Sequence, residues 1–124
     1  MHNFKELIVW QKAIQLAIKT YNFSKTLSLQ DQYIFSTQLS RCVFSIPSNI
    51  AEGAGKDSPK DFCRYLSISA GSSFELETHL IILKEIQPNK KSEIDPLLKE
   101  VEIIQKMIFG LKKKANKKIM ILDT

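Results

Sequence analysis

The sequence is poor in the residues that enzymes use for nucleophilic, acid–base and metal chemistry. Its 124 residues include two histidines, His2 and His79, and two cysteines, Cys42 and Cys63. No set of histidines, cysteines and carboxylates has the spacing of a zinc site, the paired Glu-x-x-His motifs of diiron bundles are missing, and no phosphate loop or nucleophile motif is present. We therefore expect no catalysis, no cofactor and no metal, and we expect both cysteines to be buried free thiols.

Long apolar runs are absent as well. No stretch approaches the 18 or so residues that a membrane span requires, and the first residues, MHNFKELIVWQK, have an early acid and no apolar core of a signal peptide. With 44% apolar and 25% charged residues, the composition is that of an ordinary soluble globular chain. The length fits one domain, residues 1–124. We therefore predict a single cytoplasmic domain with no membrane contact.

Arginine is scarce, and the positive charge comes mainly from lysine. Residues 1–85 carry nine Lys or Arg against eight Asp or Glu, and residues 86–124 carry nine against five, so most of the net charge of +5 lies in the last third. Its main contributors are Lys112, Lys113, Lys114, Lys117 and Lys118. Such a segment attracts RNA, DNA or an acidic protein, although a solvated helix end is the alternative, because cations also suit the helix dipole there.

Apolar residues recur at steps of three and four through four segments, which is the period of amphipathic helices. We predict helices at about 4–24, 29–54, 59–86 and 94–116, arranged as an all-α, antiparallel, up-down-up-down four-helix bundle. The inner face of the first helix is predicted to comprise Leu7, Trp10, Ile14, Ala17 and Tyr21. The segment from Ile119 to Leu122 is predicted to be a loose or docked tail.

Capping residues predict where these helices begin and end. Ser28 has the N-cap spacing to Asp31, and Ser58 is followed by Pro59 at the first helical position. Asp95-Pro96 has the same pattern for the last helix. Glycines at 53 and 55 predict a left-handed end to the second helix.

The third helix is predicted to pack on two faces. Its heptad seam comprises Phe62, Leu66, Ser69, Ser73, Leu76, Leu80 and Leu83. The nearly opposite face comprises Arg64, Ile68, Gly71, Glu75 and Thr78. A glycine inside a helix costs about 1 kcal/mol relative to alanine, so Gly71 indicates close packing on this second face. Two packing faces predict an oligomer.

The segment QLSRCVFSIPSNIAEG, residues 38–53, carries an apolar stripe and a polar stripe side by side. Pro47 interrupts the hydrogen bonds, but the apolar phase continues across it, which predicts one kinked helix. The polar stripe comprises Gln38, Arg41, Ser45, Asn49 and Glu52. Arg41 and Glu52 lie about 16 Å apart along the axis, so each needs a partner on another helix, and Glu75, Glu77 and Arg64 are available. We favour a buried ion-pair network; the alternative is a small-molecule site.

This segment, together with SPKDFCRYLSIS, AGSSFELETHL and the N-terminal Phe4, Leu7, Val9 and Trp10, resembles the motifs of the four-helix-bundle proteins of the 23S rRNA intervening-sequence type. The accessory proteins of diversity-generating retroelements, which form rings of five subunits, are similar in fold. The resemblance covers nearly the whole chain and is weaker after about residue 86. It carries over Gln38, Arg41, Ser45, Pro47, Asn49, Glu52, Gly53, Gly71, Ser72 and Glu75.

The resemblance implies an antiparallel bundle, a homo-oligomer in which five subunits are favoured, no catalysis, and a partner such as RNA, DNA or a reverse transcriptase. Where the family often has two adjacent arginines this chain has Ser40-Arg41, so one candidate cation is missing. We therefore expect a non-enzymatic oligomer that binds nucleic acid through phosphate charge, with little base reading because arginine is scarce. The alternative is a protein–protein adaptor that binds no nucleic acid.

Overall fold

The computed structural model describes the backbone of residues 2–123 and the side chains of residues 2–120. Its long helices are α1 (Ile8–Ser24), α3 (Thr37–Ala54), α4 (Pro59–Ile86) and α5 (Lys91–Asp123), and its short helical pieces are η1 (Phe4–Glu6), α2 (Leu29–Asp31), η2 (Gln32–Ser36) and η3 (Pro88–Lys90). Within residues 2–123 there is no strand, and no helix is long and apolar enough to cross a membrane. The prediction of an all-α chain with four long helices is confirmed.

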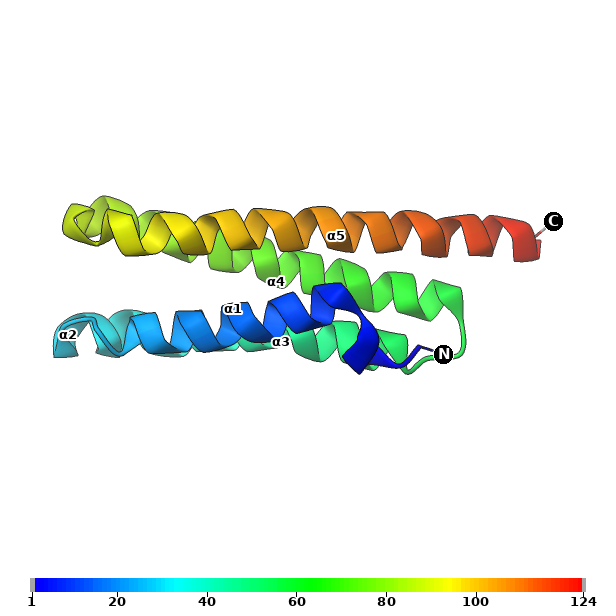
Figure 1. The fold of residues 1–124 in the computed structure, drawn as a ribbon, viewed down its shortest axis with the longest axis horizontal. Helices are drawn as coiled ribbons and strands as arrows, with labels where there is room; N and C mark the ends of the chain where they lie inside the picture. Colours follow the sequence, from blue (N-terminus) through cyan, green and yellow to red (C-terminus); the bar gives the residue numbers. More distant parts are fainter. Residues whose placement is uncertain (1, 124) are drawn as a thin grey trace.

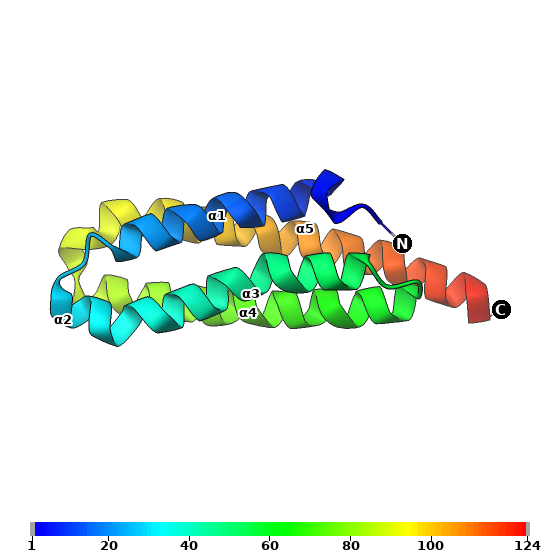
Figure 2. The same ribbon diagram turned by 90° about the horizontal axis from the view of Figure 1, so that it is seen from below.

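The long helices lie side by side, and the connections between them alternate between the two ends of the molecule (Figures 1 and 2). Helix α1 packs against α3 and α5, and α4 packs against the same two helices, with the most extensive interface between α3 and α4. The four helices therefore form a cycle in the order α1, α3, α4, α5. The C-terminal end of α5 projects beyond the other helices, at the end of the molecule where the N-terminus lies (Figures 1 and 2).

Helix α4 was predicted most accurately. It begins where Ser58 accepts a hydrogen bond from the amide of Asp61, at 3.3 Å, with Pro59 in the first helical position. All seven residues of its predicted heptad seam are buried. Within that seam, the Ser69 hydroxyl donates to the Ile46 carbonyl of α3 at 2.9 Å. The two small serines therefore let α3 and α4 approach closely and still satisfy their own hydroxyls.

The second predicted helix forms with one irregular turn. The Ser28 cap is confirmed, since its hydroxyl accepts from the Asp31 amide at 3.2 Å. The chain then passes through α2, the π-helical turn η2 and α3 without leaving helical geometry. Pro47 lies inside α3 and is buried, so the prediction of one helix rather than two is confirmed.

The predicted left-handed end of this helix was wrong. Gly55 has a φ of −79°, and no residue described in the structure has a positive φ. The helix needs glycine at 53 for space, not for backbone conformation, because a Cβ there would lie 2.7 Å from the Cβ of Tyr65 on α4. The close approach of α3 to α4 near this end depends on that missing side chain.

The predicted inner face of the first helix was only partly correct: Ala17 is buried and Leu7 and Trp10 pack against the core, but Tyr21 is exposed. The buried residues of α1 are Val9, Ala13, Leu16, Ala17, Thr20, Phe23 and Ser24, while Ile18 is 56% exposed and Tyr21 is 46% exposed. The backbone explains the error, because Ser24 donates its hydroxyl to the Tyr21 carbonyl at 2.7 Å and can therefore enter the core at low cost. The helix itself is shorter than predicted at its start, where Leu7 is extended between η1 and α1.

The last helix is longer than predicted at both ends. The turn η3 leads directly into α5 at Lys91, so Pro96 lies inside the helix, not at its first position. Asp95 does not cap the helix; it accepts from Lys84 at 3.0 Å and from Lys91 at 2.6 Å. The segment predicted as a tail, 119–122, is helical. Leu111 of this helix is partly buried, and the other apolar residues predicted to face inward are buried, namely Ile94, Leu97, Val101, Ile104, Ile108 and Ala115.

Candidate functional site

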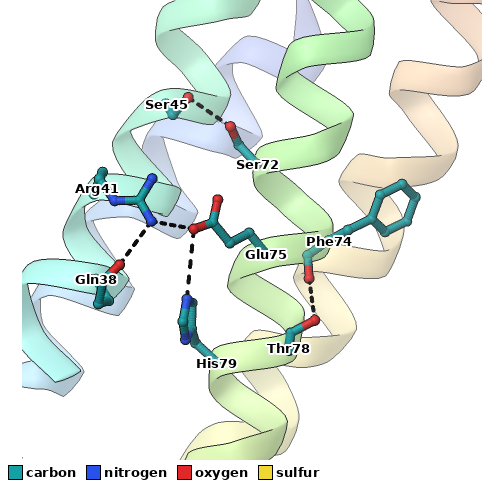
Figure 3. A network of polar contacts seen from close by, with 8 residues as sticks. All are labelled: Gln38, Arg41, Ser45, Ser72, Phe74, Glu75, Thr78 and His79. Carbon is teal, nitrogen blue, oxygen red and sulfur yellow. Dashed lines mark hydrogen bonds and ion pairs between the residues drawn. The ribbon is translucent and has the colours of Figure 1, made fainter. Parts of the chain in front are cut away.

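The polar stripe of α3 meets α4 at the surface of the bundle. Arg41 donates to the Glu75 carboxylate across the two helices and to the Gln38 side chain at 2.8 Å, and His79 Nε2 lies 3.8 Å from the same Glu75 oxygen (Figure 3). The Arg41 side chain is 57% exposed and that of Glu75 is 40% exposed. The prediction of a buried ion-pair network was therefore wrong in its burial, although Glu75 was one of the two acids that it offered as a partner for Arg41.

The Arg41–Glu75 pair shifts the pKa of each group in the direction that favours its charged form. The hydrogen bond from Arg41 holds the pKa of Glu75 below its usual range, and the hydrogen bond to Glu75 raises the pKa of Arg41. The pair therefore stays ionised at neutral pH and fixes the position of the Glu75 carboxylate between α3 and α4.

The other members of the predicted network do not join this pair. Glu52 is exposed. Asn49 donates to the Ser45 carbonyl at 2.8 Å and to its hydroxyl at 2.9 Å, within α3 itself. Arg64 lies 4.0 Å from Asp61 on its own helix. Next to the Arg41–Glu75 pair, a hydrogen bond of 2.7 Å between the hydroxyls of Ser45 and Ser72 also joins the two helices.

Sequence reasoning missed a group of three metal-ligand types beside this pair. The thiol of Cys42, a carboxylate oxygen of Glu75 and a ring nitrogen of His79 all lie within 4.8 Å of one another. Burial raises the pKa of the Cys42 thiol to about 11, and the neighbouring Glu75 carboxylate acts in the same direction. The only signal in the sequence was the spacing of four between Glu75 and His79, because Cys42 comes from another helix.

The five candidate lysines lie on the end of α5. Lys113, Lys114, Lys117 and Lys118 are exposed, and Lys112 is half-buried with its amine 5.6 Å from the ring centroid of Phe109. Three of the five, at 114, 117 and 118, line a pocket of about 470 Å³. Three of the candidate lysines therefore lie at this pocket, and Lys112 and Lys113 lie on the remaining surface of α5.

This pocket also includes residues that the sequence did not place near the lysines. Lys56 and Asp57 come from the loop between α3 and α4, the first turn of α4 borders the pocket, and Phe62 and Leu111 form its apolar side. His2 lies against the ring of Phe62, with 5.0 Å between centroids. Burial and the nearby charge of Lys118 lower the pKa of His2. We call this site the basic pocket. Its cations are Lys56, Lys114, Lys117 and Lys118.

Two apolar faces remain exposed on opposite sides of the helix cycle. A groove of about 390 Å³ between α1 and α3 is lined by Ile14, Ala17, Ile18, Tyr21, Phe44, Pro47 and Ser48. Across the bundle, the rings of Phe74 on α4 and Phe109 on α5 lie 6.3 Å apart, and both are about half exposed. On this side of α4, a Cβ at Gly71 would meet nothing within 4 Å. The second face of α4 is therefore open in the single chain.

Comparison with known proteins places the chain in a family. It is similar to the crystal structure of a protein of unknown function from the S23 ribosomal protein family of Bacteroides thetaiotaomicron, with a TM-score of 0.79 and 24% identity over 86% of this chain and 99% of that one. No curated protein matches the chain. The family model of the 23S rRNA-intervening sequence proteins matches residues 5–110. This match, over the helices and over the motifs of α3 and α4, shows that the chain belongs to the family of 23S rRNA-intervening sequence proteins.

Proposed function

We propose that this chain is a non-enzymatic, oligomeric helical bundle that binds RNA or DNA non-specifically through its basic pocket. The observation that carries the proposal is the convergence of Lys56, from the loop between α3 and α4, with three lysines of α5 around one pocket. Lysine amines from two separate segments place several positive charges close together, and phosphate groups can neutralise these charges. The N-terminal turn of α4 at the rim adds the positive end of its helix dipole.

The chemistry of the pocket supports charge recognition rather than base reading. Lysine amines act as point charges, whereas bidentate recognition of guanine requires arginine. Both arginines are elsewhere, with Arg41 paired to Glu75 and Arg64 beside Asp61. The apolar side of the pocket accommodates a base or sugar in any sequence. The lysines at 112–118 lie beyond the residues that the family model matches, so the proposal concerns this chain in particular.

We propose further that the apolar groove between α1 and α3 binds the Phe74–Phe109 face of a second copy. The two faces differ and lie on opposite sides of the bundle, so their contact is heterologous and repeats from one copy to the next. A closed ring forms when the successive rotations from one copy to the next add up to a full turn. The family resemblance favours five subunits. A ring of antiparallel, up-down-up-down bundles would carry one basic pocket per subunit and hold several phosphate sites in a fixed array.

The salt dependence of binding tests the nucleic-acid part of the proposal. Fluorescence anisotropy with labelled single-stranded RNA and duplex DNA gives the slope of log affinity against log salt, to which each phosphate contact adds about −0.7 on single strands and about −0.9 on duplex DNA. The triple variant Lys114→Gln, Lys117→Gln, Lys118→Gln should weaken binding by the same factor on every sequence. The slope should become less steep by the contribution of one phosphate contact for each lysine that binds a phosphate.

The control is a charge-matched triple variant at the far end of the bundle, Lys25→Gln, Lys90→Gln, Lys99→Gln. It changes net charge equally but leaves the basic pocket intact, so it should retain the steep slope. Equal losses in the two triple variants would show that total charge alone causes binding and would contradict the pocket. If the wild type does not bind at low salt, the protein–protein adaptor function remains.

A further inference from the structure

We propose that Cys42, Glu75 and His79 form a zinc site that links α3 to α4. The three side chains offer a sulfur, an oxygen and a nitrogen, all within 4.8 Å of one another, and come from two helices that pack together over their length. Among the residues whose side chains the structure describes, this is the one group of three such ligands. It is separate from the basic pocket, so it stands independently of the proposed nucleic-acid binding.

The separations are close to those of a bound ion. Zinc bonds of about 2.0–2.3 Å in tetrahedral geometry place ligand atoms about 3.3–3.8 Å apart, with the shortest separation between a nitrogen and an oxygen. His79 Nε2 lies 3.8 Å from Glu75 Oε2, so this pair has to approach by about 0.5 Å. The longest separation in the group, at most 4.8 Å, has to shorten by about 1 Å. Changes of side-chain rotamer supply a movement of that size without moving a helix.

The ligand types suit zinc better than a hard cation. Thiolate and imidazole are typical zinc ligands, whereas calcium and magnesium prefer sites made of oxygen. Zinc binding displaces the proton of the Cys42 thiol into solvent, and the resulting thiolate and the Glu75 carboxylate together balance the two charges of the ion. Three protein ligands leave a fourth position for water, as in zinc sites that remain open to an additional ligand.

The surroundings provide both support and access. Arg41 donates to Glu75 Oε2 and is itself held by Gln38, so the carboxylate is oriented toward His79, whose Nε2 lies near the same oxygen (Figure 3). The side chains of His79 and Glu75 are 25% and 40% exposed, which gives an ion a path from solvent. Cys42 is buried and supplies the inner ligand.

The test uses the reduced full-length protein and two metal probes. Zinc affinity is measured by competition with a chromophoric chelator, and Co²⁺ is added to read the thiolate-to-cobalt charge-transfer absorption. We expect one ion per chain in the wild type. Cys42→Ser, Glu75→Gln and His79→Gln should each weaken zinc binding by more than the roughly 10–100-fold that loss of a supporting second-shell partner costs. Cys42→Ser should also abolish the charge-transfer absorption.

The chain contains matched controls for each ligand. Cys63→Ser, Glu52→Gln and His2→Gln remove the same chemical groups outside the site and should leave affinity and absorption unchanged. Zinc should raise the melting temperature of the wild type and of Cys63→Ser but not that of Cys42→Ser, because an ion that binds only the folded state stabilises it. Glu75→Gln and His79→Gln change half-exposed side chains, so they test the site even if Cys42→Ser fails to fold.

Two results would overturn the proposal. The first is a wild-type chain that takes up neither zinc nor cobalt. The second is loss of the cobalt absorption in Cys63→Ser but not in Cys42→Ser, which would place any metal at the other thiol.

Discussion

Gly53 and Gly71 provide a matched pair of substitutions to alanine whose effects should differ in sign. Both glycines lie inside long helices, so each change gains up to about 1 kcal/mol of helix propensity. At Gly53 the new Cβ would lie 2.7 Å from the Cβ of Tyr65 and 3.1 Å from Cδ1 of Phe62. At Gly71 it would meet nothing within 4 Å. Both variants gain the same helix propensity, so the difference between their free energies of unfolding measures the cost of the close contact of α3 with α4.

Overpacking of a tight contact costs about 1–3 kcal/mol. The Tyr65 Cβ is attached directly to the backbone and cannot rotate away, which places the cost in the upper part of that range. We therefore expect Gly53→Ala to be destabilising by about 1–2 kcal/mol net of propensity. Gly71→Ala in the single chain should be stabilising by up to about 1 kcal/mol.

Urea unfolding followed by circular dichroism measures both changes. The experiment is run at several protein concentrations, because subunit contacts would add to the stability of an oligomer. Gly110→Ala serves as a second control, since a Cβ at this exposed position in α5 also meets nothing within 4 Å. Equal shifts in the Gly53 and Gly71 variants would refute the close contact of the two helices at Tyr65.

Three further predictions follow from the ion pairs and the exposed faces. Arg41→Met should leave the urea midpoint unchanged relative to the surface control Lys12→Met, because the Arg41 ion pair is solvent-exposed. Asp95→Asn should be destabilising at neutral pH, because hydrogen bonds from two lysines lower the pKa of Asp95 in the folded chain. The contribution of Asp95 to folding stability is therefore present above its unfolded pKa and is lost as the pH falls below about 4, where the melting curves of wild type and variant should converge. Ile18→Asp and Phe109→Asp should each reduce the mass measured by light scattering, and a wild-type monomer at tens of micromolar would contradict the oligomer.

The features that could be predicted from sequence are those that depend on neighbouring residues. The start of α4 follows from Ser58 and Pro59, and its buried seam follows from a heptad repeat sustained along the helix. In α1 two apolar stripes compete, and the predicted stripe includes Tyr21, which is exposed. Hydrophobicity alone ranks Thr20 below Tyr21, and the burial of Thr20, whose hydroxyl has no hydrogen-bond partner among the described residues, depends on how the helices pack.

The candidate sites depend on contacts between distant segments, and their prediction was correspondingly partial. The partner of Arg41 was among the acids that the sequence offered, but its exposure depends on how far α3 rotates against α4. The lysines of α5 were visible as a cluster, whereas Lys56 joins them only through the turn between α3 and α4. Cys42 and His79 are 37 positions apart in the chain (79 − 42 = 37) and share a site through the packing of two helices.

The projecting end of α5 links helix formation to charge neutralisation. Lys113 and Lys117, and likewise Lys114 and Lys118, stand four positions apart near the end of α5 that projects beyond the other helices (Figures 1 and 2). Like charges at this spacing each oppose the helix by about 0.2–0.5 kcal/mol. A polyanion that neutralises these amines removes the repulsion, so it binds more tightly to the helical form than to the unwound form. By thermodynamic linkage, the helical content of the last turns should rise with polyanion concentration and fall when salt displaces the polyanion.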